Sequence, residues 1–298
     1  MSWRSVLVSN PARLSLKSCH LVIKQEEETH IPLEDVSVVV LETDQAVITS
    51  KLLDEMARRG IPLFTCDPKH LPSGLLLSFQ QHSRFLKVLK TQLELTLPFK
   101  KNCWRLIVEQ KIKNQAICLE ILGKNGDEEL RRIADNVKSG DATNRESAAA
   151  RLYFDTYMPN TSRQEDNTTN AALNYGYSIM RGAVARSLTA YGFLPAVGLH
   201  HRNELNSFNL ADDFMELFRP LVDLWVARNI TEGKEFTKKE RVGLLSLLNA
   251  DIVIFLERHA VFRAIDIMIS SFSNACSYGK PELLKLPELL PLSAHVWK

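Results

Sequence analysis

The sequence lacks the motifs that mark several common classes of enzyme. It contains no phosphate-binding loop of the G-x-x-x-x-G-K-[ST] type, no G-x-G-x-x-G and no G-x-S-x-G. These loops cradle phosphates, bind dinucleotides or present a serine nucleophile. Their absence leaves no support for a nucleotide-driven motor, a dinucleotide-dependent enzyme or an esterase.

Cysteine is scarce, and long apolar runs are missing. The five cysteines are odd in number and contain no C-x-x-C pair, which argues against a disulfide framework and a structural zinc site and favours a reducing compartment. They are Cys19, Cys66, Cys103, Cys118 and Cys276. The chain begins without a basic-then-apolar segment, and its most apolar stretch, 242–256, is interrupted by Asn249 and Asp251. We therefore expect a cytoplasmic protein without a membrane partner.

The sequence also lacks a strong excess of charge of one sign. Its formal net charge is only +2, so DNA binding cannot be inferred from bulk charge and requires basic residues gathered on one face. The basic candidates are Arg84, Lys87, Lys90, Lys100, Lys101, Arg105, Lys111, Lys113, Arg181 and Arg186. A basic stripe made of these residues is a hypothesis, which a fall in DNA affinity with rising salt would test.

The hydrophobic pattern divides the chain into two parts. Short β-type runs punctuated by proline, asparagine and acidic residues fill the first part, together with one helix at 51–59. The runs lie at 6–8, 14–16, 21–23, 36–41 and 61–65. From Ser83 onward the apolar residues follow helical spacing. We predict an α+β protein with a strand-rich N-terminal domain at 1–80, a helical linker at 81–97 and a larger all-α domain at 98–298.

Several local signals predict helix ends in the second part. The segments 143–146 and 237–240 both match a capping box, in which a threonine and a glutamate satisfy the first backbone N–H groups of a helix. A helix opening at Asn209 or Leu210 should kink at Pro220, because proline removes a backbone donor. The β-branched residues of 251–255 predict a short strand or a buried turn.

The most informative stretch runs from Gly198 to Pro220. A polar loop holding two histidines and three asparagines leads into a helix that presents Asp212, Asp213 and Glu216 within one turn. Carboxylates packed together are unfavourable unless a cation or an arginine neutralises them, and a histidine with carboxylates suits Mg²⁺ or Mn²⁺. Acidic residues also favour the first turn of any helix, because they interact with the helix dipole. Spacing alone slightly favours the dipole explanation.

Glu146 leaves a similar choice open. Its place in the 143–146 capping box explains it without any function. Arg145 and Arg151 flank it, however, and the alanines at 148–150 keep this helix slim, so that another group can approach closely.

Taken together, these motifs resemble a known family. The motifs are Glu146-Ser-Ala-Ala-Ala-Arg151 with Tyr153-Phe154, Asn170-Ala-Ala-Leu-Asn-Tyr-Gly-Tyr177, Gly198-Leu-His-His201 and Asp213-Phe-Met-Glu216-Leu-Phe-Arg-Pro220. In order and spacing they resemble the CRISPR-associated spacer-acquisition integrases, the family of the first Cas protein, and most closely its type II form. The resemblance covers essentially the whole chain.

The resemblance implies that Glu146, His201 and Glu216 form the catalytic site and bind Mg²⁺ or Mn²⁺. His201 is preferred to His200 because it fills the fourth place of the family's G-x-x-H, and Asp213 is a second-tier ligand. The implied reaction is a transesterification, in which the 3′-hydroxyl of a captured DNA fragment attacks a phosphodiester of the CRISPR repeat. Implied partners are double-stranded DNA, a second copy bound through the N-terminal domain, and the small second Cas protein.

Three alternative functions stay open from the sequence. The first is a metal-dependent nuclease for branched or single-stranded nucleic acid, which would use the same site without joining DNA. The second is a DNA-binding scaffold with an inert site. The third is a helical interaction protein without a role on DNA, for which weak and salt-independent DNA binding would be expected.

Overall fold

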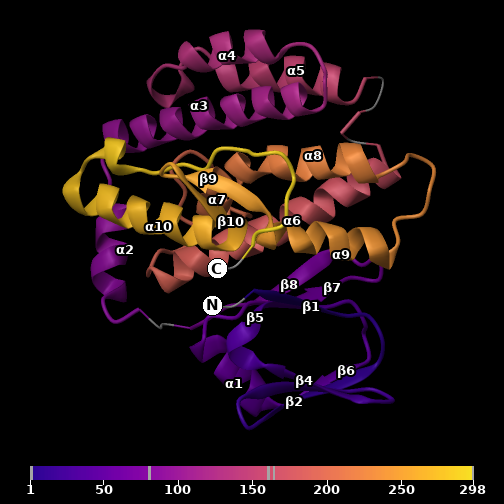
Figure 1. Cartoon of the computed structure of the whole chain (residues 1–298). Coiled ribbons are helices and arrows are strands. Elements are labelled where there is room, and N and C mark those ends of the chain that lie inside the picture. Colours follow the sequence, from indigo (N-terminus) through magenta and orange to yellow (C-terminus); the bar gives the residue numbers. More distant parts are fainter. Residues whose placement is uncertain (1–2, 80–81, 160–161, 164, 297–298) are drawn as a thin grey trace. The chain divides into compact units, whose positions relative to one another are not determined.

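The computed structural model describes residues 3–79, 82–159, 162–163 and 165–296, and the chain forms two compact units, 1–85 and 86–298. The first unit is rich in strands and the second is mainly helical (Figure 1). This confirms the predicted α+β class. No helix within the described residues has the length and apolar character needed to cross a membrane.

Two four-stranded sheets make up most of the first unit. One has the order β1 (Arg4–Val8), β5 (Val36–Leu41), β7 (Leu63–Cys66), β8 (Pro72–Leu76). The other has the order β4 (Glu28–Pro32), β3 (His20–Lys24), β2 (Ala12–Lys17), β6 (Ala46–Ile48). Every side chain of β5 is buried, as its continuous apolar run predicts. Helix α1 (Ser50–Arg58) buries Leu52 and Met56 in the core of this unit.

Strands β4 and β8 were not predicted from the sequence. β4 starts in an acidic run and ends at Pro32, while β8 starts at Pro72, and these residue types usually interrupt strands. Both strands lie at the edge of a sheet, where a proline without an N–H is tolerated. The edge position therefore explains why breaking residues occur in strands here.

Helix α3 (Leu97–Ile121) is the longest element of the second unit and contacts α4 (Asp127–Asp135), α5 (Arg145–Tyr157) and α8 (Arg219–Asn229) (Figure 1). Thr96 caps it by accepting a hydrogen bond from the Phe99 N–H, and Pro98 lies in its first turn. Pro98 thus marks a helix start. Since helices pack on several sides of α3, its buried residues are not confined to one stripe.

The remaining helices are α2 (Phe85–Leu93), α6 (Thr168–Ala190), α7 (Asn209–Met215), α9 (Lys238–Ser246) and α10 (Val261–Tyr278). The predicted capping box is present at α9, where Thr237 and Glu240 satisfy each other's backbone N–H groups. The second unit is not purely helical, because β9 (Asp251–Ile254) and β10 (Glu257–Ala260) form an antiparallel hairpin. Of the short strand or buried turn predicted at 251–255, the strand is present as β9.

The kink expected at Pro220 is present and has a structural consequence. Pro220 has no N–H to donate to the carbonyl of Glu216, so the regular helical pattern is interrupted there. A three-residue 3₁₀ turn, η3 (Glu216–Phe218), separates α7 from α8. Glu216 is therefore presented at a break between two helices.

Candidate metal centre

The side chain of Glu146 is not used to cap its own helix. The capping box predicted at 143–146 is wrong, because Asn144 has a φ of 51° and no side chain at the N-cap position closes the helix. The Asp141 carboxylate caps α5 instead, accepting the N–H of Arg145 at 2.7 Å and that of Glu146 at 3.0 Å. The Glu146 side chain is thereby left for contacts beyond its own helix.

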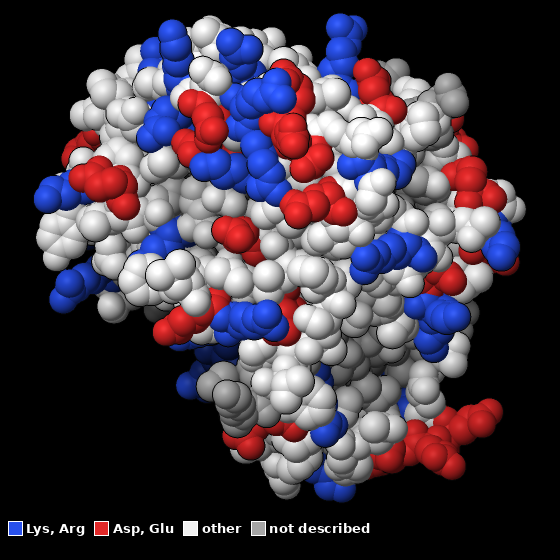
Figure 2. Space-filling view, turned by 45° about the horizontal axis from the view of Figure 1, so that its top comes forward, with Lys and Arg blue, Asp and Glu red and all other residues white. Residues whose placement is uncertain are grey.

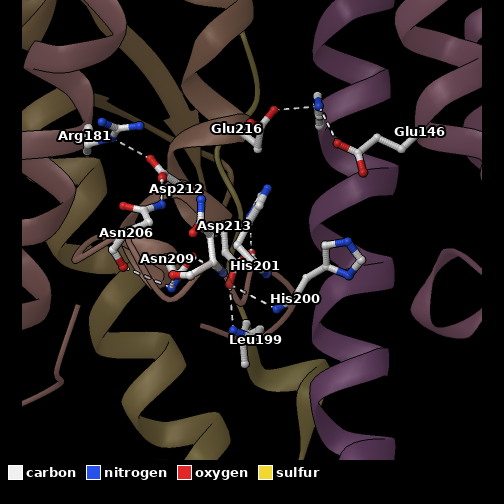
Figure 3. Close-up of polar contacts among 12 residues, drawn as sticks. Glu146, Arg181, Leu199, His200, His201, Asn206, Asn209, Asp212, Asp213 and Glu216 are labelled. Atoms are coloured by element: carbon white, nitrogen blue, oxygen red, sulfur yellow. Dashed lines mark hydrogen bonds and ion pairs between the residues drawn. The ribbon is translucent and has the colours of Figure 1, made fainter. Parts of the chain in front are cut away.

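Glu146 and Glu216 converge on one buried cation. The Lys111 Nζ of α3 lies 2.7 Å from Glu146 Oε1 and 2.5 Å from Glu216 Oε2, and the two glutamates are labelled in Figure 3. Arg219 Nε lies 2.9 Å from the other oxygen of Glu216. The Lys111 and Glu216 side chains are only 9% and 6% exposed. Two carboxylates from distant segments thus share one cationic atom in a nearly dry position.

The charges at this position stabilise one another. Burial by itself would raise the pKa of Glu216, but Lys111 and Arg219 outweigh burial, so the pKa lies below its usual value. Burial would likewise lower the pKa of Lys111, but Glu216 and Glu146 outweigh it and raise this pKa. Lys111 and Glu216 are therefore both charged at neutral pH.

Asn114 connects α3 by hydrogen bonds to the segment that carries Glu216 and to the C-terminal segment. Its side-chain amide donates to the carbonyls of Leu217 at 3.0 Å and Pro287 at 3.1 Å, and its oxygen accepts the N–H of Leu289 at 3.1 Å. Neither Asn114 nor the role of Lys111 was recognised from the sequence. The available signal was the presence of polar residues among the apolar positions of a long helix, which is unusual unless they are paired.

The loop before α7 is held by Asp213. This fully buried carboxylate accepts the N–H groups of Leu199 at 2.6 Å, His200 at 3.2 Å and His201 at 3.2 Å (Figure 3). It also lies 2.7 Å from His201 Nδ1. Asp213 is thus engaged in positioning the loop and the His201 ring, and the second ring nitrogen, Nε2, is left to face another partner.

Gly198 is required by the tight packing of this loop. A Cβ placed on it would lie 2.4 Å from the carbonyl oxygen of His201 and 3.0 Å from Asp213 Oδ2. Both neighbours are fixed by the hydrogen bonds of Asp213, so neither can move aside cheaply. The glycine of the G-x-x-H motif is therefore explained by close backbone approach.

The two adjacent histidines have different surroundings. The His200 ring stacks on Trp104 of α3, with centroids 4.2 Å apart and an interplanar angle of 2°, whereas His201 meets Trp104 edge-on at 5.7 Å. The hydrogen bond to Asp213 raises the pKa of His201 above its usual value, against the opposing effect of burial. The charge of His201 also interacts with Glu216. His201 thus faces the carboxylates, while His200 packs against α3.

The three acids of the α7–η3 segment do not form one cluster. Asp212 pairs with Arg181 Nε at 2.6 Å and accepts a hydrogen bond from Asn206 at 2.7 Å. Asp213 binds the preceding loop (Figure 3), and Glu216 pairs with Lys111 and Arg219. Although their spacing puts these acids within one turn, each side chain contacts different partners, and arginines pair with Asp212 and Glu216.

The donor set nevertheless fits a hard divalent cation. Within the described ranges, no three His, Cys, Asp or Glu side chains are arranged as a ready metal-binding group. Glu146 and Glu216 both contact the Lys111 ammonium, however, at 2.7 and 2.5 Å, and the charge of His201, whose ring is fixed by Asp213, interacts with Glu216. Carboxylate oxygens with an imidazole nitrogen suit Mg²⁺ or Mn²⁺.

Several basic residues considered as DNA contacts are held in ion pairs. Lys111 is buried between two glutamates and is not exposed to a phosphate there. Arg105 and Lys113 both pair with Glu109, at 2.9 and 2.6 Å. Figure 2 shows Lys and Arg interleaved with Asp and Glu on the face that it draws. A basic stripe for DNA stays a prediction.

The sequence and fold can be compared with those of known proteins. The family model described as CRISPR associated protein Cas1 matches residues 6–251. The chain is 44% identical, over the full length of both proteins, to the CRISPR-associated endonuclease Cas1 of Neisseria meningitidis serogroup C (strain 8013).

Two solved structures share the fold at low sequence identity. A casposase bound to an integration product has a TM-score of 0.75 and 16% identity, and 93% of this chain matches 91% of that chain. A chain of a Cas6-RT-Cas1–Cas2 complex has a TM-score of 0.73 and 19% identity, and 97% of this chain matches 36% of that longer chain. The family match and the full-length relative confirm the resemblance seen in the motifs, and the chain belongs to the CRISPR-associated Cas1 family.

Proposed function

We propose that this protein is a divalent-metal-dependent DNA integrase of CRISPR adaptation, which joins the 3′ ends of captured foreign DNA to the CRISPR repeat. The observation that carries the proposal is the convergence of Glu146 and Glu216 on one buried cation, together with a His201 that Asp213 orients and whose charge interacts with Glu216. The full-length relative is named an endonuclease, and one protein of similar fold was solved with an integration product. These names support DNA cleavage and joining as the reaction class.

Glu146, Glu216 and His201 would hold Mg²⁺ or Mn²⁺. When bound, the ion supplies polarisation of a phosphoryl oxygen and stabilisation of the leaving oxygen. Asp213 keeps the His201 Nδ1–H as a donor, so that Nε2 carries the lone pair needed by a ligand. Arg219 restrains the Glu216 carboxylate from the opposite side.

In the proposed reaction the nucleophile comes from DNA. The 3′-hydroxyl of the captured fragment attacks a phosphodiester of the repeat, a new P–O bond forms, and the 3′ oxygen of the repeat strand leaves. The protein's residues therefore position the reacting groups and balance their charge, and none of them needs to form a covalent intermediate.

The proposal also assigns partners. Similar chains occur in structures named Cas6-RT-Cas1–Cas2 complexes, which supports assembly with the small second Cas protein. We assign homodimerisation to the strand-rich domain at 1–80, a linking role to 81–97 and catalysis to 98–298. Size measurement of the purified chain with and without the small partner protein tests this assignment.

A strand-joining assay tests the proposed reaction. Labelled duplex DNA is incubated with a repeat-bearing plasmid, the small partner protein and Mn²⁺, and joined product is measured. Glu146→Gln, Glu216→Gln and His201→Ala should each lower joining by roughly 10²-fold or more, whereas Glu128→Gln, at an exposed acid of α4, should leave joining unchanged. Full activity in Glu216→Ala combined with loss in Asp213→Ala would show that the wrong acid has been assigned.

A second candidate is a metal-dependent nuclease for branched or single-stranded nucleic acid, which the endonuclease name of the full-length relative favours. The same site would serve it. Metal-dependent cleavage without joined product, in the presence of the small partner, would establish the nuclease instead. Joining or cleavage that survives in Glu146→Gln would point away from this site for both candidates.

A further inference from the structure

The candidate metal centre is electrically balanced without a metal ion. The negative charges of Glu146 and Glu216 are matched by the positive charges of Lys111 and Arg219, each within 2.5–2.9 Å of a carboxylate oxygen. The Lys111 and Glu216 side chains are nearly inaccessible to water, which would otherwise screen added charge. A divalent ion added to this arrangement would leave it with an excess of two positive charges.

Lys111 also occupies the space that the ion would need. Its Nζ lies within 2.7 Å of both glutamates, and a divalent ion bound by the same carboxylates would lie at roughly 2.0–2.2 Å from their oxygens. An ammonium and a divalent ion at such distances would overlap and repel each other. The two cations therefore exclude one another at this pair of carboxylates.

We propose that the Lys111 ammonium is a resident counter-cation, which holds Glu146 and Glu216 together before a divalent ion arrives and leaves both carboxylates when the ion binds. The inference rests on the proposed function, because it names the residue that competes for the metal of that site. It makes Lys111 a positioning residue whose displacement is part of metal binding.

The side chains suit this exchange. Lysine carries its charge at the end of a flexible four-carbon stem, so its ammonium can move while its backbone stays in place. The backbone of α3 is fixed one turn away by the hydrogen bonds of Asn114 to Leu217 and Pro287. Arg219 pairs with the other oxygen of Glu216 and keeps that carboxylate oriented during the exchange.

Direct measurement of Mn²⁺ binding tests the inference. In Lys111→Met the competing charge is removed and most of the side-chain volume is kept, so Mn²⁺ affinity measured by electron paramagnetic resonance should rise at least tenfold. The melting temperature of the metal-free variant should fall, and its increase on adding Mn²⁺ should exceed that of the wild type. A dissociation constant within twofold of the wild type, or a weaker one, would overturn the inference.

Lys113→Met is the matched control. Lys113 lies on the same helix, is 37% exposed and pairs with Glu109 at 2.6 Å, outside the candidate site. Lys113→Met removes one positive charge only two residues from Lys111 on α3. Since Lys113 pairs with Glu109 rather than with Glu146 or Glu216, Mn²⁺ affinity should stay at the wild-type value. An equal gain in affinity in both variants would show a general charge effect and contradict the role of Lys111.

Labelling of the wild-type protein covers the possibility that Lys111→Met does not fold. An amine-reactive ester should modify Lys111 slowly without metal and faster with saturating Mn²⁺, as followed by peptide mass spectrometry, while the rate at Lys113 stays constant. An unchanged rate at Lys111 under saturating Mn²⁺ would overturn the inference.

Glu216→Gln separates this inference from the proposed function. If the wild type binds Mn²⁺ and Glu216→Gln does not, the metal site stands, and the Lys111 results alone decide the inference. If neither the wild type nor Lys111→Met binds Mn²⁺, both the metal site and the inference are overturned.

Discussion

Glu216 and Asp223 are two buried carboxylates on one continuous stretch of chain, yet their surroundings differ. Glu216 lies 2.5 Å from the Lys111 ammonium and 2.9 Å from the Arg219 guanidinium. The Asp223 carboxylate accepts hydrogen bonds from the hydroxyls of Tyr153 at 2.9 Å and Tyr177 at 2.5 Å. One acid is balanced by full charges and the other by neutral dipoles.

This difference sets the two pKa values apart. Burial raises the pKa of Asp223 to about 6, although the tyrosine hydroxyls oppose the rise. Burial acts on Glu216 in the same direction, but the two cations reverse its effect and lower the pKa. Burial alone therefore does not identify a functional carboxylate. The charge of its neighbours separates a candidate ligand from a structural acid.

The largest expected effect is on activity. Glu216→Gln should lower strand joining by roughly 10²–10³-fold, since metal polarisation contributes several kcal/mol and each 1.36 kcal/mol is tenfold in rate. Asp223→Asn should leave joining close to the wild-type rate, because Asp223 faces tyrosines. Initial rates of joining at saturating Mn²⁺ measure both. Equal losses in the two variants would remove the distinction between them.

The next effect is on stability. Asp223→Ala leaves the buried hydroxyls of Tyr153 and Tyr177 without their acceptor, which should cost about 3 kcal/mol in the free energy of unfolding. Urea titration of the full chain measures this loss, with the exposed Asp155→Ala on α5 as control. Mn²⁺ affinity at low urea should be unchanged. A loss of Mn²⁺ binding would place Asp223 in the metal site.

The pH dependence of stability should have opposite signs at the two acids. The pKa of Asp223 in the folded protein, about 6, exceeds its ordinary 3.8, so its contribution to stability decreases as pH rises from 4 to 6. As pH rises from 4 to 6, the free energy of unfolding of Asp223→Asn should therefore increase by about 2–3 kcal/mol relative to that of the wild type.

The pKa of Glu216 lies below its ordinary 4.5, so its contribution is present above pH 4.5 and is lost as pH falls through the folded value. The stability difference between wild type and Glu216→Gln should therefore shrink in acid. Unfolding free energies of the two variants and the wild type, measured in chelator between pH 3 and 7, test both signs. Slopes of the same sign for the two variants would contradict this account.

The smallest expected effect comes from Tyr157. Its hydroxyl donates to the backbone carbonyl of Asp223 at 2.8 Å and does not contact the carboxylate. Tyr157→Phe should cost about 1 kcal/mol in unfolding free energy. The pH dependence attributed to Asp223 should persist in this variant, and joining should stay at the wild-type rate. Disappearance of the pH effect would mean that the carboxylate depends on Tyr157 as well.

Local patterns predicted most elements of the fold. Apolar runs marked β5 and β7, helical spacing marked the long helices, and Pro220 marked the break that presents Glu216. The strands β4 and β8 were missed, because an edge strand tolerates residues that a central strand excludes. The capping box at Glu146 was wrong because Asp141, from the preceding turn, took over the capping.

The fold class and the family could be predicted from the amino-acid sequence alone, and the family resemblance nominated Glu146, His201 and Glu216 as site residues. Periodicity, helix caps and motif order depend on residues close together in the chain, so they can be read without a structure. The placement of Lys111 between Glu146 and Glu216, and the contact of Asp213 with His201 Nδ1, depend on tertiary packing. Charge balance is set by side chains brought together from distant segments, and their distances are fixed only when the helices pack.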